Sequence, residues 1–221
     1  MEKYKVVEIF TSINGEGMVA GKLSVFVRFQ GCNLRCNYCD TMWANEETCA
    51  YTWMSADEIV EKVKEADVRN VTITGGEPLL QKDIWVLLDK LIDFGVKVEI
   101  ETNGSVDISK FIHGDRRPVF TLDYKLAGSG MEQQMLMSNY EYVCKDDTVK
   151  FVVSDTDDLN RAYDICKTYR LGEKCNIILS PVFGRIEPEQ MVEFMKEKHF
   201  NEARIGLQLH KIIWDPDKTG V

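Results

Sequence analysis

Short runs of β-branched and aromatic residues alternate along this chain with segments of helical periodicity. Short apolar runs bounded by turn residues are typical of strands, and longer segments with a 3.6-residue period are typical of helices. A strand–helix–strand order implies parallel pairing through right-handed crossovers, so the sequence predicts an α/β protein. The predicted strands are Lys5–Phe10, Ser24–Gln30, Asn70–Thr74, Val96–Glu101, Val119–Asp123, Thr148–Val153, Asn176–Ser180 and Arg204–Leu209.

Four of the intervening segments carry the signals of α-helices. Ser55 is a favoured N-cap, and Glu58 stands three residues later at the capping-box position. Two other segments end at or near a glycine, and the fourth has a proline just inside its start. The predicted helices are Ala56–Ala66, Asp83–Phe94, Thr156–Arg170 and Glu187–Lys198.

The length of the chain limits the choice of α/β fold. A closed eight-fold barrel usually needs about 250 residues, and this chain has 221. Once the N-terminal part is assigned to a strand pair and a loop, about six strands remain for a barrel wall. We therefore predict an incomplete, open TIM-like (β/α)6 barrel, as a single domain over residues 1–221. A doubly wound sheet is the alternative, and in both folds the active site lies at the carboxyl ends of the strands.

Composition and charge argue against several classes of protein. The chain is 44% hydrophobic and 29% charged, as in an ordinary water-soluble domain. It opens MEKYKVVEIF, without an apolar leader, and no run approaches the roughly 20 apolar residues of a membrane span. We therefore expect a cytoplasmic protein without a membrane partner. A net charge of −9 and a pI near 5.0 disfavour a nucleic-acid partner.

Three of the seven cysteines are clustered at ligand spacing. Cys32, Cys36 and Cys39 form a C-x3-C-x2-C pattern in the loop 31–41, directly after a predicted strand. Structural zinc sites and ferredoxin clusters normally use four protein ligands. Three thiolates instead leave one iron of a [4Fe–4S] cluster open to the amino and carboxylate groups of a small molecule. Three metal-free thiols, or a zinc site completed by His113, are the alternatives.

The cysteine spacing, with the aromatic Tyr38 just before the third cysteine, resembles the signature of the radical S-adenosylmethionine (SAM) superfamily. Residues 74–78 read TGGEP at the end of the strand Asn70–Thr74 and resemble the GGEP motif of that superfamily. Paired glycines at a strand end let a ligand approach the backbone closely. In the superfamily, this edge receives the amino group of SAM.

Four further segments narrow the resemblance: FTSINGEG at 10–17, FVRFQG at 26–31, ETNG at 101–104 and LQLHK at 207–211. Together they are similar to the 7-carboxy-7-deazaguanine synthases of the queuosine and 7-deazapurine pathway. The resemblance implies conversion of 6-carboxy-5,6,7,8-tetrahydropterin to 7-carboxy-7-deazaguanine with loss of ammonia. A 5′-deoxyadenosyl radical would take the C6 hydrogen and be regenerated. The implied cofactors are a [4Fe–4S] cluster, SAM and Mg2+. The implied partners are a flavodoxin- or ferredoxin-type electron donor and a second copy of the chain.

The same resemblance assigns binding roles to individual residues. It assigns no catalytic side chain, because the cofactor carries the radical. The metal ligands would be Cys32, Cys36 and Cys39 for the cluster and Thr41 for Mg2+. The SAM contacts would be Tyr38, Gly75, Gly76, Glu77, Asp123, Tyr124 and Lys125. The substrate contacts would be Ile13, Asn14, Gly15, Glu16, Arg28, Thr74, His210 and Val221.

Several of these residues also have a purely structural interpretation. Arg28 alternates with apolar neighbours on its strand, so it either clamps the substrate carboxylate or pairs with a nearby acid. Thr41 could cap a helix. The group around Tyr124 could be a charged strand end, His210 a structural histidine, and Val221 part of a frayed tail. Asn14 stands where the family commonly has glutamine.

Two rival functions remain open at this stage. A glycyl-radical activating enzyme has the same cysteine spacing, but the NGEG and QLHK segments argue against it. An iron–sulfur electron-transfer module would need a fourth cluster ligand. It would also have no use for a GGEP motif.

Overall fold

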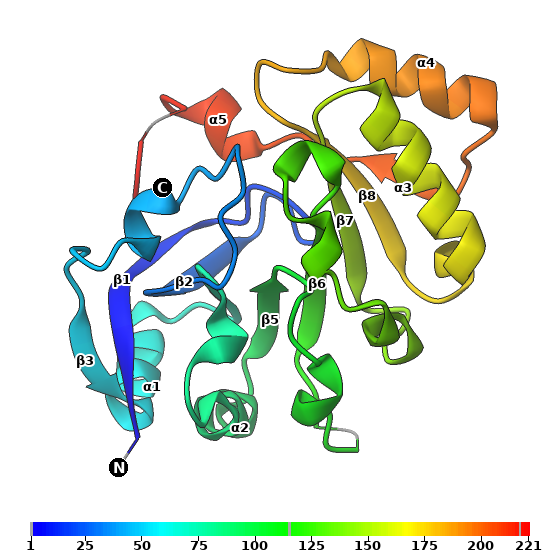
Figure 1. The fold of residues 1–221 in the computed structure, drawn as a ribbon. Helices are drawn as coiled ribbons and strands as arrows, with labels where there is room; N and C mark the ends of the chain where they lie inside the picture. Colours follow the sequence, from blue (N-terminus) through cyan, green and yellow to red (C-terminus); the bar gives the residue numbers. More distant parts are fainter. Residues whose placement is uncertain (1, 115, 217) are drawn as a thin grey trace.

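The computed structural model describes residues 2–114, 116–216 and 218–221. Its strands form one nine-stranded sheet in the order β3-β1-β2-β4-β5-β6-β7-β8-β9 (Figure 1). From β2 to β9 neighbouring strands are parallel, whereas β1 is antiparallel to β2 and to β3. The strands are β1 Lys3–Ile13, β2 Leu23–Phe29, β3 Thr52–Ser55, β4 Asn70–Gly75, β5 Lys97–Thr102, β6 Val119–Tyr124, β7 Thr148–Val153, β8 Asn176–Pro181 and β9 Ala203–Ile205.

The strand order decides between the two predicted folds. A doubly wound sheet reverses its strand order at a switch point. Here the parallel strands follow one another in chain order from β2 to β9, as in a barrel wall. Within the described residues, β3 and β9 at the two ends of the sheet pair with one strand each, so the barrel is open. The incomplete TIM-like barrel is therefore confirmed.

All four predicted helices are present, and a short fifth one was not predicted. The capping box is formed as expected, because the Ser55 hydroxyl accepts the Glu58 N–H while Glu58 accepts the Ser55 N–H at 2.7 Å. Arg170, in a left-handed conformation, ends its helix before Gly172 is reached. The helices are α1 Ala56–Ala66, α2 Ile84–Phe94, α3 Thr156–Tyr169, α4 Pro188–Lys198 and α5 Leu209–Ile213.

The barrel wall departs from a regular strand–helix repeat in two places. In the described chain, the connections from β5 to β6 and from β6 to β7 contain only short 3₁₀ segments.

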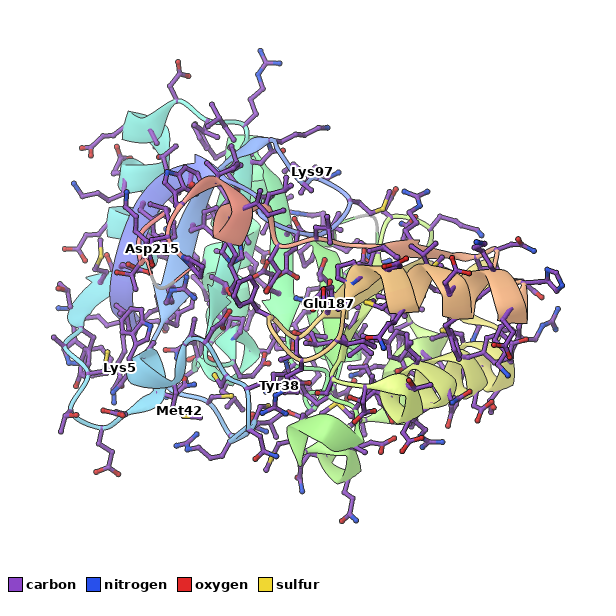
Figure 2. The ribbon with its side chains drawn as sticks, turned by 90° about the horizontal axis from the view of Figure 1, so that it is seen from above. Lys5, Tyr38, Met42, Lys97, Glu187 and Asp215 are labelled. Atoms are coloured by element: carbon purple, nitrogen blue, oxygen red, sulfur yellow. The ribbon has the colours of Figure 1, made fainter. Side chains whose placement is uncertain are left out.

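Strand β3 was not predicted, and it lies at the edge of the sheet beside β1. The predicted strand Arg204–Leu209 is shorter than expected, because β9 ends at Ile205 and Leu209 begins α5. Seen from above, α3 and α4 lie side by side on the outer side of the sheet (Figure 2).

Alternation along the strands separates the apolar core from a polar interior face. Val27, Ile73, Ile100, Phe120 and Phe151 are all fully buried in the core that the sheet shares with its helices. Side chains next to them in sequence point to the opposite face, since a strand has a two-residue repeat. That opposite face carries the site. No helix of the described chain is long and apolar enough to cross a membrane.

Candidate active site

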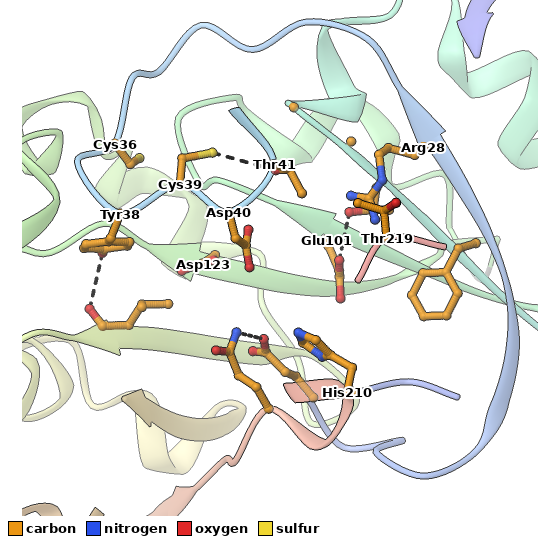
Figure 3. Close-up of a pocket in the computed structure, with 18 of the residues that line it drawn as sticks. Arg28, Cys36, Tyr38, Cys39, Asp40, Thr41, Glu101, Asp123, His210 and Thr219 are labelled. Carbon is orange, nitrogen blue, oxygen red and sulfur yellow. Dashed lines mark hydrogen bonds between the residues drawn. The ribbon is translucent and has the colours of Figure 1, made fainter. Parts of the chain in front are cut away.

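The inner face of the open barrel lines a cavity of about 680 Å³ (Figure 3). Loop residues after β1, β2 and β4 contribute to it, as do β6, β7 and, near the C-terminus, Gln208, His210, Lys211, Pro216 and residues 218–221. Every residue predicted for the site except Asn14, Glu77 and Tyr124 lines this cavity. Those that do are Ile13, Gly15, Glu16, Arg28, Cys32, Cys36, Tyr38, Cys39, Thr41, Thr74, Gly75, Gly76, Asp123, Lys125, His210 and Val221.

The side chain of Tyr124 points away from the cavity. It follows Asp123 on β6, so the two side chains lie on opposite faces. The Tyr124 hydroxyl donates to Glu132 Oε1 at 2.9 Å, and its ring packs against Phe151 in the core. A SAM contact by this side chain is not supported by its position.

Asn14 and Glu77 are buried behind the cavity wall. The Asn14 side chain accepts the Thr72 hydroxyl at 3.0 Å, and its backbone closes the loop that joins β1 and β2. Glu77 is completely buried and accepts three hydrogen bonds, from the Thr102 hydroxyl and from the N–H groups of Leu79 and Asn103. Burial outweighs these donors and raises the pKa of Glu77 to about 7. Both residues therefore shape the loops around the cavity.

The three clustered cysteines line one end of the cavity as free thiols. Burial raises the pKa of Cys36 to about 11, so this thiol stays neutral unless a metal deprotonates it. In the described residues, no three His, Cys, Asp or Glu side chains meet at one point as ligands of a single ion would. A cubane binds each cysteine at a different iron, so three thiols spread around a common space fit a cluster better. His113 bridges to Arg116 elsewhere, which removes the support for a zinc site.

Amide groups lie against two of the three sulfurs. The Asn103 amide donates to Cys32 Sγ at 3.5 Å, and the Asn45 amide donates to Cys39 Sγ at 3.9 Å. Tyr38 ties the loop to β7, because its hydroxyl donates to the Val152 carbonyl at 3.3 Å. The cysteine loop is thus held by contacts from the turn after β5 and from β7.

Thr41 stands at the start of the 3₁₀ segment η1 (Met42–Asn45) but makes no capping hydrogen bond with its side chain. Its hydroxyl lies 3.7 Å from Cys39 Sγ and faces the cavity (Figure 3). Among the described residues the capping alternative therefore finds no support, and the hydroxyl faces the cavity with this sulfur as its neighbour.

Buried ionic groups occupy the middle of the cavity. Lys150 Nζ lies 2.9 Å from Glu16 Oε2 and 3.3 Å from Asp123 Oδ2, and Lys125 also pairs with Asp123, at 2.8 Å. Gln208 donates to the other Glu16 oxygen at 2.6 Å. Burial opposes ionisation of Glu16, but the Lys150 ammonium and the Gln208 amide outweigh it and lower the pKa to about 2. Glu16 is therefore a carboxylate at neutral pH.

Lys150 and Gln208 were not among the predicted site residues. Lys150 had a usable signal, since it is the one charge in the strand sequence TVKFVV and resembles Arg28 in that respect. Gln208 lies in the LQLHK segment, but only the fold brings it to Glu16. Glu101, which accepts the Thr74 hydroxyl at 2.8 Å, was also missed although it opens the ETNG segment.

Arg28 pairs with an acidic side chain, as expected if its role is structural, but the Arg28 side chain also lines the cavity. Its Nε donates to Glu8 Oε1 at 2.7 Å. In the described chain, the two terminal nitrogens of its guanidinium have no hydrogen bond. Phe10 and Phe26 stack beside it with ring centroids 5.0 Å apart. This end of the cavity therefore combines a flat aromatic wall with a guanidinium that can still donate hydrogen bonds from its two terminal nitrogens.

His210 and the C-terminal residues close the cavity opposite the sheet. A Cβ at Gly15 would lie 2.2 Å from His210 Nδ1, so only glycine allows this approach. Burial lowers the pKa of His210 and so favours the neutral imidazole. Lys211 pairs with Asp40 of the cysteine loop at 3.5 Å. Val221 lies at the cavity, and the C-terminus is close to the loop after β2 (Figure 1).

Comparison with known proteins identifies the family. The model of the radical SAM superfamily matches residues 26–121. Over 219 residues the chain is 55% identical to the 7-carboxy-7-deazaguanine synthase of Clostridium acetobutylicum, with 99% of each chain covered. The chain belongs to the 7-carboxy-7-deazaguanine synthase family. The family member of Chlorobaculum tepidum is 37% identical, over 97% of this chain and 96% of its own.

Solved structures of other proteins have the same fold as this member of the 7-carboxy-7-deazaguanine synthase family. QueE from Escherichia coli superposes with a TM-score of 0.76 at 22% identity, covering 93% of this chain and 94% of that one. SuiB from Streptococcus suis, solved with bound SAM, has a TM-score of 0.55 at 15% identity and covers 80% and 44% of the two chains. As a radical SAM protein, the chain has a [4Fe–4S] cluster and SAM as its cofactors. The electron-transfer module and the glycyl-radical activating enzyme are no longer needed as alternatives.

Proposed function

We propose that this chain is a 7-carboxy-7-deazaguanine synthase, which converts 6-carboxy-5,6,7,8-tetrahydropterin to 7-carboxy-7-deazaguanine and ammonia. The observation that carries the proposal is that one cavity joins the three cysteines to a polar end lined by Arg28, Glu16 and His210. A small heterocycle with a carboxylate, a flat ring and a guanidine-like edge matches that end of the cavity. The identity and full-length coverage of the relatives support the same assignment.

The cofactors would bind at the cysteine end. Cys32, Cys36 and Cys39 would hold the cluster, and when bound the cluster and SAM supply the means to abstract a hydrogen atom from the substrate. The backbone of Gly75 and Gly76 would meet the methionine part of SAM, since both glycines line the cavity. Asp123 Oδ1 is buried and has no hydrogen-bond partner among the described residues, so it can accept a donor from a ligand.

The substrate would bind between the aromatic wall and the C-terminal segment. The free nitrogens of Arg28 would clamp the carboxylate, because a guanidinium can donate two parallel hydrogen bonds. Ionised Glu16 would accept N–H groups from the guanidine-like edge of the pterin, and neutral His210 would contribute a donor or an acceptor. Thr74 and the backbone of Ile13 and Gly15 would border the ring. Thr41 would hold Mg2+ together with substrate oxygens and water, since Mg2+ keeps several non-protein ligands.

We expect the aromatic side chains at the cavity to help exclude water once the ligands are bound. Phe10, Phe26, Trp43 and Phe183 line it together with residues 218–221. A covered cavity protects a reactive intermediate from solvent and fixes the reacting groups in one geometry. A cavity of about 680 Å³ also suits a small molecule better than the peptide loop that a glycyl-radical activating enzyme must admit.

The function is tested by anaerobic turnover of the reconstituted protein. Iron, sulfide, dithionite, SAM and Mg2+ are supplied, and 6-carboxytetrahydropterin is followed by mass spectrometry. We expect a product lighter by one ammonia, with SAM consumed far below the amount of product. Deoxyadenosine release with unchanged pterin would contradict the proposed substrate. An electron donor of the flavodoxin or ferredoxin type and a homodimer stay predictions, tested by replacing dithionite and by light scattering.

Replacing Arg28 by lysine is expected to raise the KM for the pterin by about 10- to 100-fold with a smaller change in kcat, because lysine keeps the charge and loses the bidentate fork. Steady-state kinetics at saturating SAM measure both parameters. Arg170→Lys is the matched control, since its guanidinium also pairs with a glutamate but is exposed. An unchanged KM in the Arg28→Lys variant would place the substrate carboxylate elsewhere.

A further inference from the structure

The turn that follows β5 lies against the cysteine loop. It contains Asn103, which is buried, lines the cavity and is not among the residues assigned above to SAM or substrate. Asn103 Nδ2 donates to Cys32 Sγ at 3.5 Å and to Asn33 Oδ1 at 3.0 Å. The side chain therefore contacts both a cluster ligand and the residue after it. These contacts join loops 70 residues apart in the sequence.

The Asn103 amide is fixed in this orientation by its other partners. Its Oδ1 accepts the backbone N–H of Ser105 at 2.9 Å and the Ser105 hydroxyl at 2.6 Å. Its own backbone N–H donates to the buried Glu77 carboxyl at 2.7 Å. Turning the amide over would set Nδ2 against the Ser105 N–H and Oδ1 against sulfur. The network thus assigns the donor to Cys32.

The three cysteines differ in the donors that face them. Cys32 receives the Asn103 amide and, at 3.4 Å, the backbone N–H of Leu34. Cys39 has longer contacts, with the Thr41 hydroxyl at 3.7 Å and with the Asn45 amide at 3.9 Å. In the described chain, no side-chain amide donates to Cys36. Among the three clustered cysteines, Cys32 therefore has the shortest contact with a side-chain donor in the described chain.

Hydrogen bonds to the sulfurs of an iron–sulfur cluster are one of the factors that set its reduction potential. The reduced cluster carries one more negative charge than the oxidised cluster. An N–H directed at a cysteine sulfur stabilises that extra charge, so it raises the potential. A donor held rigidly needs no rearrangement when the electron arrives, which increases its effect.

We propose that Asn103 is a positioning residue that raises the reduction potential of the [4Fe–4S] cluster by donating a hydrogen bond to Cys32. A weaker reductant could then reduce the cluster than would be needed without this hydrogen bond. The inference depends on the radical SAM cofactor and is independent of the pterin. A failure of the proposed substrate would therefore leave it standing.

The test compares two variants with a matched control by redox titration of the reconstituted full chain, without SAM, monitored by EPR. Asn103→Leu removes the donor without adding a charge. Asn103→Asp keeps the acceptor for Ser105 and removes the donor, but it also adds a negative charge that by itself lowers the potential. Asn139→Leu is the control, because Asn139 braces the same turn through the carbonyls of Gly104 and Val106 and has no hydrogen bond to a cysteine in the described chain. Iron and sulfide analysis confirms that each protein holds a complete cluster.

We expect both Asn103 variants to hold four irons and to be harder to reduce than the parent. At a fixed ambient potential, the ratio of reduced to oxidised cluster should fall about tenfold, which corresponds to about 59 mV for a one-electron couple. The control should keep the parent potential. A parent-like potential in Asn103→Leu would overturn the proposal, as would an equal shift in the control. Loss of the cluster from both Asn103 variants would also overturn it, because the contact would then serve assembly.

Discussion

Replacing Lys150 by methionine is expected to destabilise the folded protein by about 3–5 kcal/mol and to remove most of its activity. The ammonium lies between Glu16 and Asp123, and all three side chains are at most 17% exposed. Methionine fills a similar volume but leaves the carboxylates without their shared counter-charge. Urea denaturation at pH 7 measures the stability, and the pterin assay measures the activity.

The cost of this substitution should depend on pH. The folded-state pKa of Glu16, about 2, is below its unfolded value near 4.5, so the stabilisation is present above pH 4.5 and is lost as the pH falls towards 2. The Lys150→Met variant should therefore lose less stability than the parent over this range. An equal difference in unfolding free energy at pH 7 and pH 3 would contradict the argument.

A matched control and a second substitution distinguish the effect of breaking this buried ion pair from the general effect of losing a lysine. Lys167 pairs with Glu202 at 3.2 Å, but both side chains are more than 40% exposed. Lys167→Met should therefore cost less than about 1 kcal/mol. Adding Glu16→Gln to Lys150→Met should recover part of the lost stability, since it removes one unpaired buried charge.

Replacing Gly76 by alanine is the second change with a large expected effect. A Cβ at this position would lie 2.1 Å from both the Gly31 carbonyl oxygen and Asn45 Oδ1. The Glu77 N–H donates to the same Gly31 carbonyl at 2.9 Å, so this backbone, one residue before Cys32, is held in place. Overpacking of this kind costs about 1–3 kcal/mol and displaces the backbone. We expect a reduced iron content after reconstitution and at least about tenfold weaker SAM binding, since 1.4 kcal/mol is a factor of ten.

Gly172→Ala is the control for this substitution. Its Cβ would lie 2.6 Å from Cγ and 2.7 Å from Cβ of Glu202, so this position is overpacked as well, but it does not line the cavity of the described chain. The control should keep the parent's iron content and SAM affinity, although overpacking lowers its thermal midpoint. A Gly76→Ala protein with full iron content and unchanged SAM affinity would show that the close packing of this turn is not required.

Much of the fold could be predicted from local patterns. The capping box at Ser55 and Glu58 fixes the start of α1, and Pro188 fixes the start of α4, because capping depends only on residues within one helical turn. Strand β7 has the predicted bounds because its apolar run ends at polar residues. Strand β3 could not be predicted, since its four residues TWMS are stabilised by pairing with β1.

The sequence by itself determined the chemistry at the cysteine end of the site. The spacing of Cys32, Cys36 and Cys39 and the TGGEP segment are local properties of single loops, and the family match agrees with them. These residues line one cavity because parallel strands bring their carboxyl ends to the same edge of the sheet.

Only the tertiary structure decided the other end of the site. Lys150 and Glu16 are 134 residues apart, and Gln208 and Glu16 are 192 residues apart, so no local pattern could pair them. Strand register sent the Tyr124 side chain into the core and left Asp123 at the cavity. The physical reason is that side-chain direction along a strand and charge pairing across a sheet depend on which strands become neighbours.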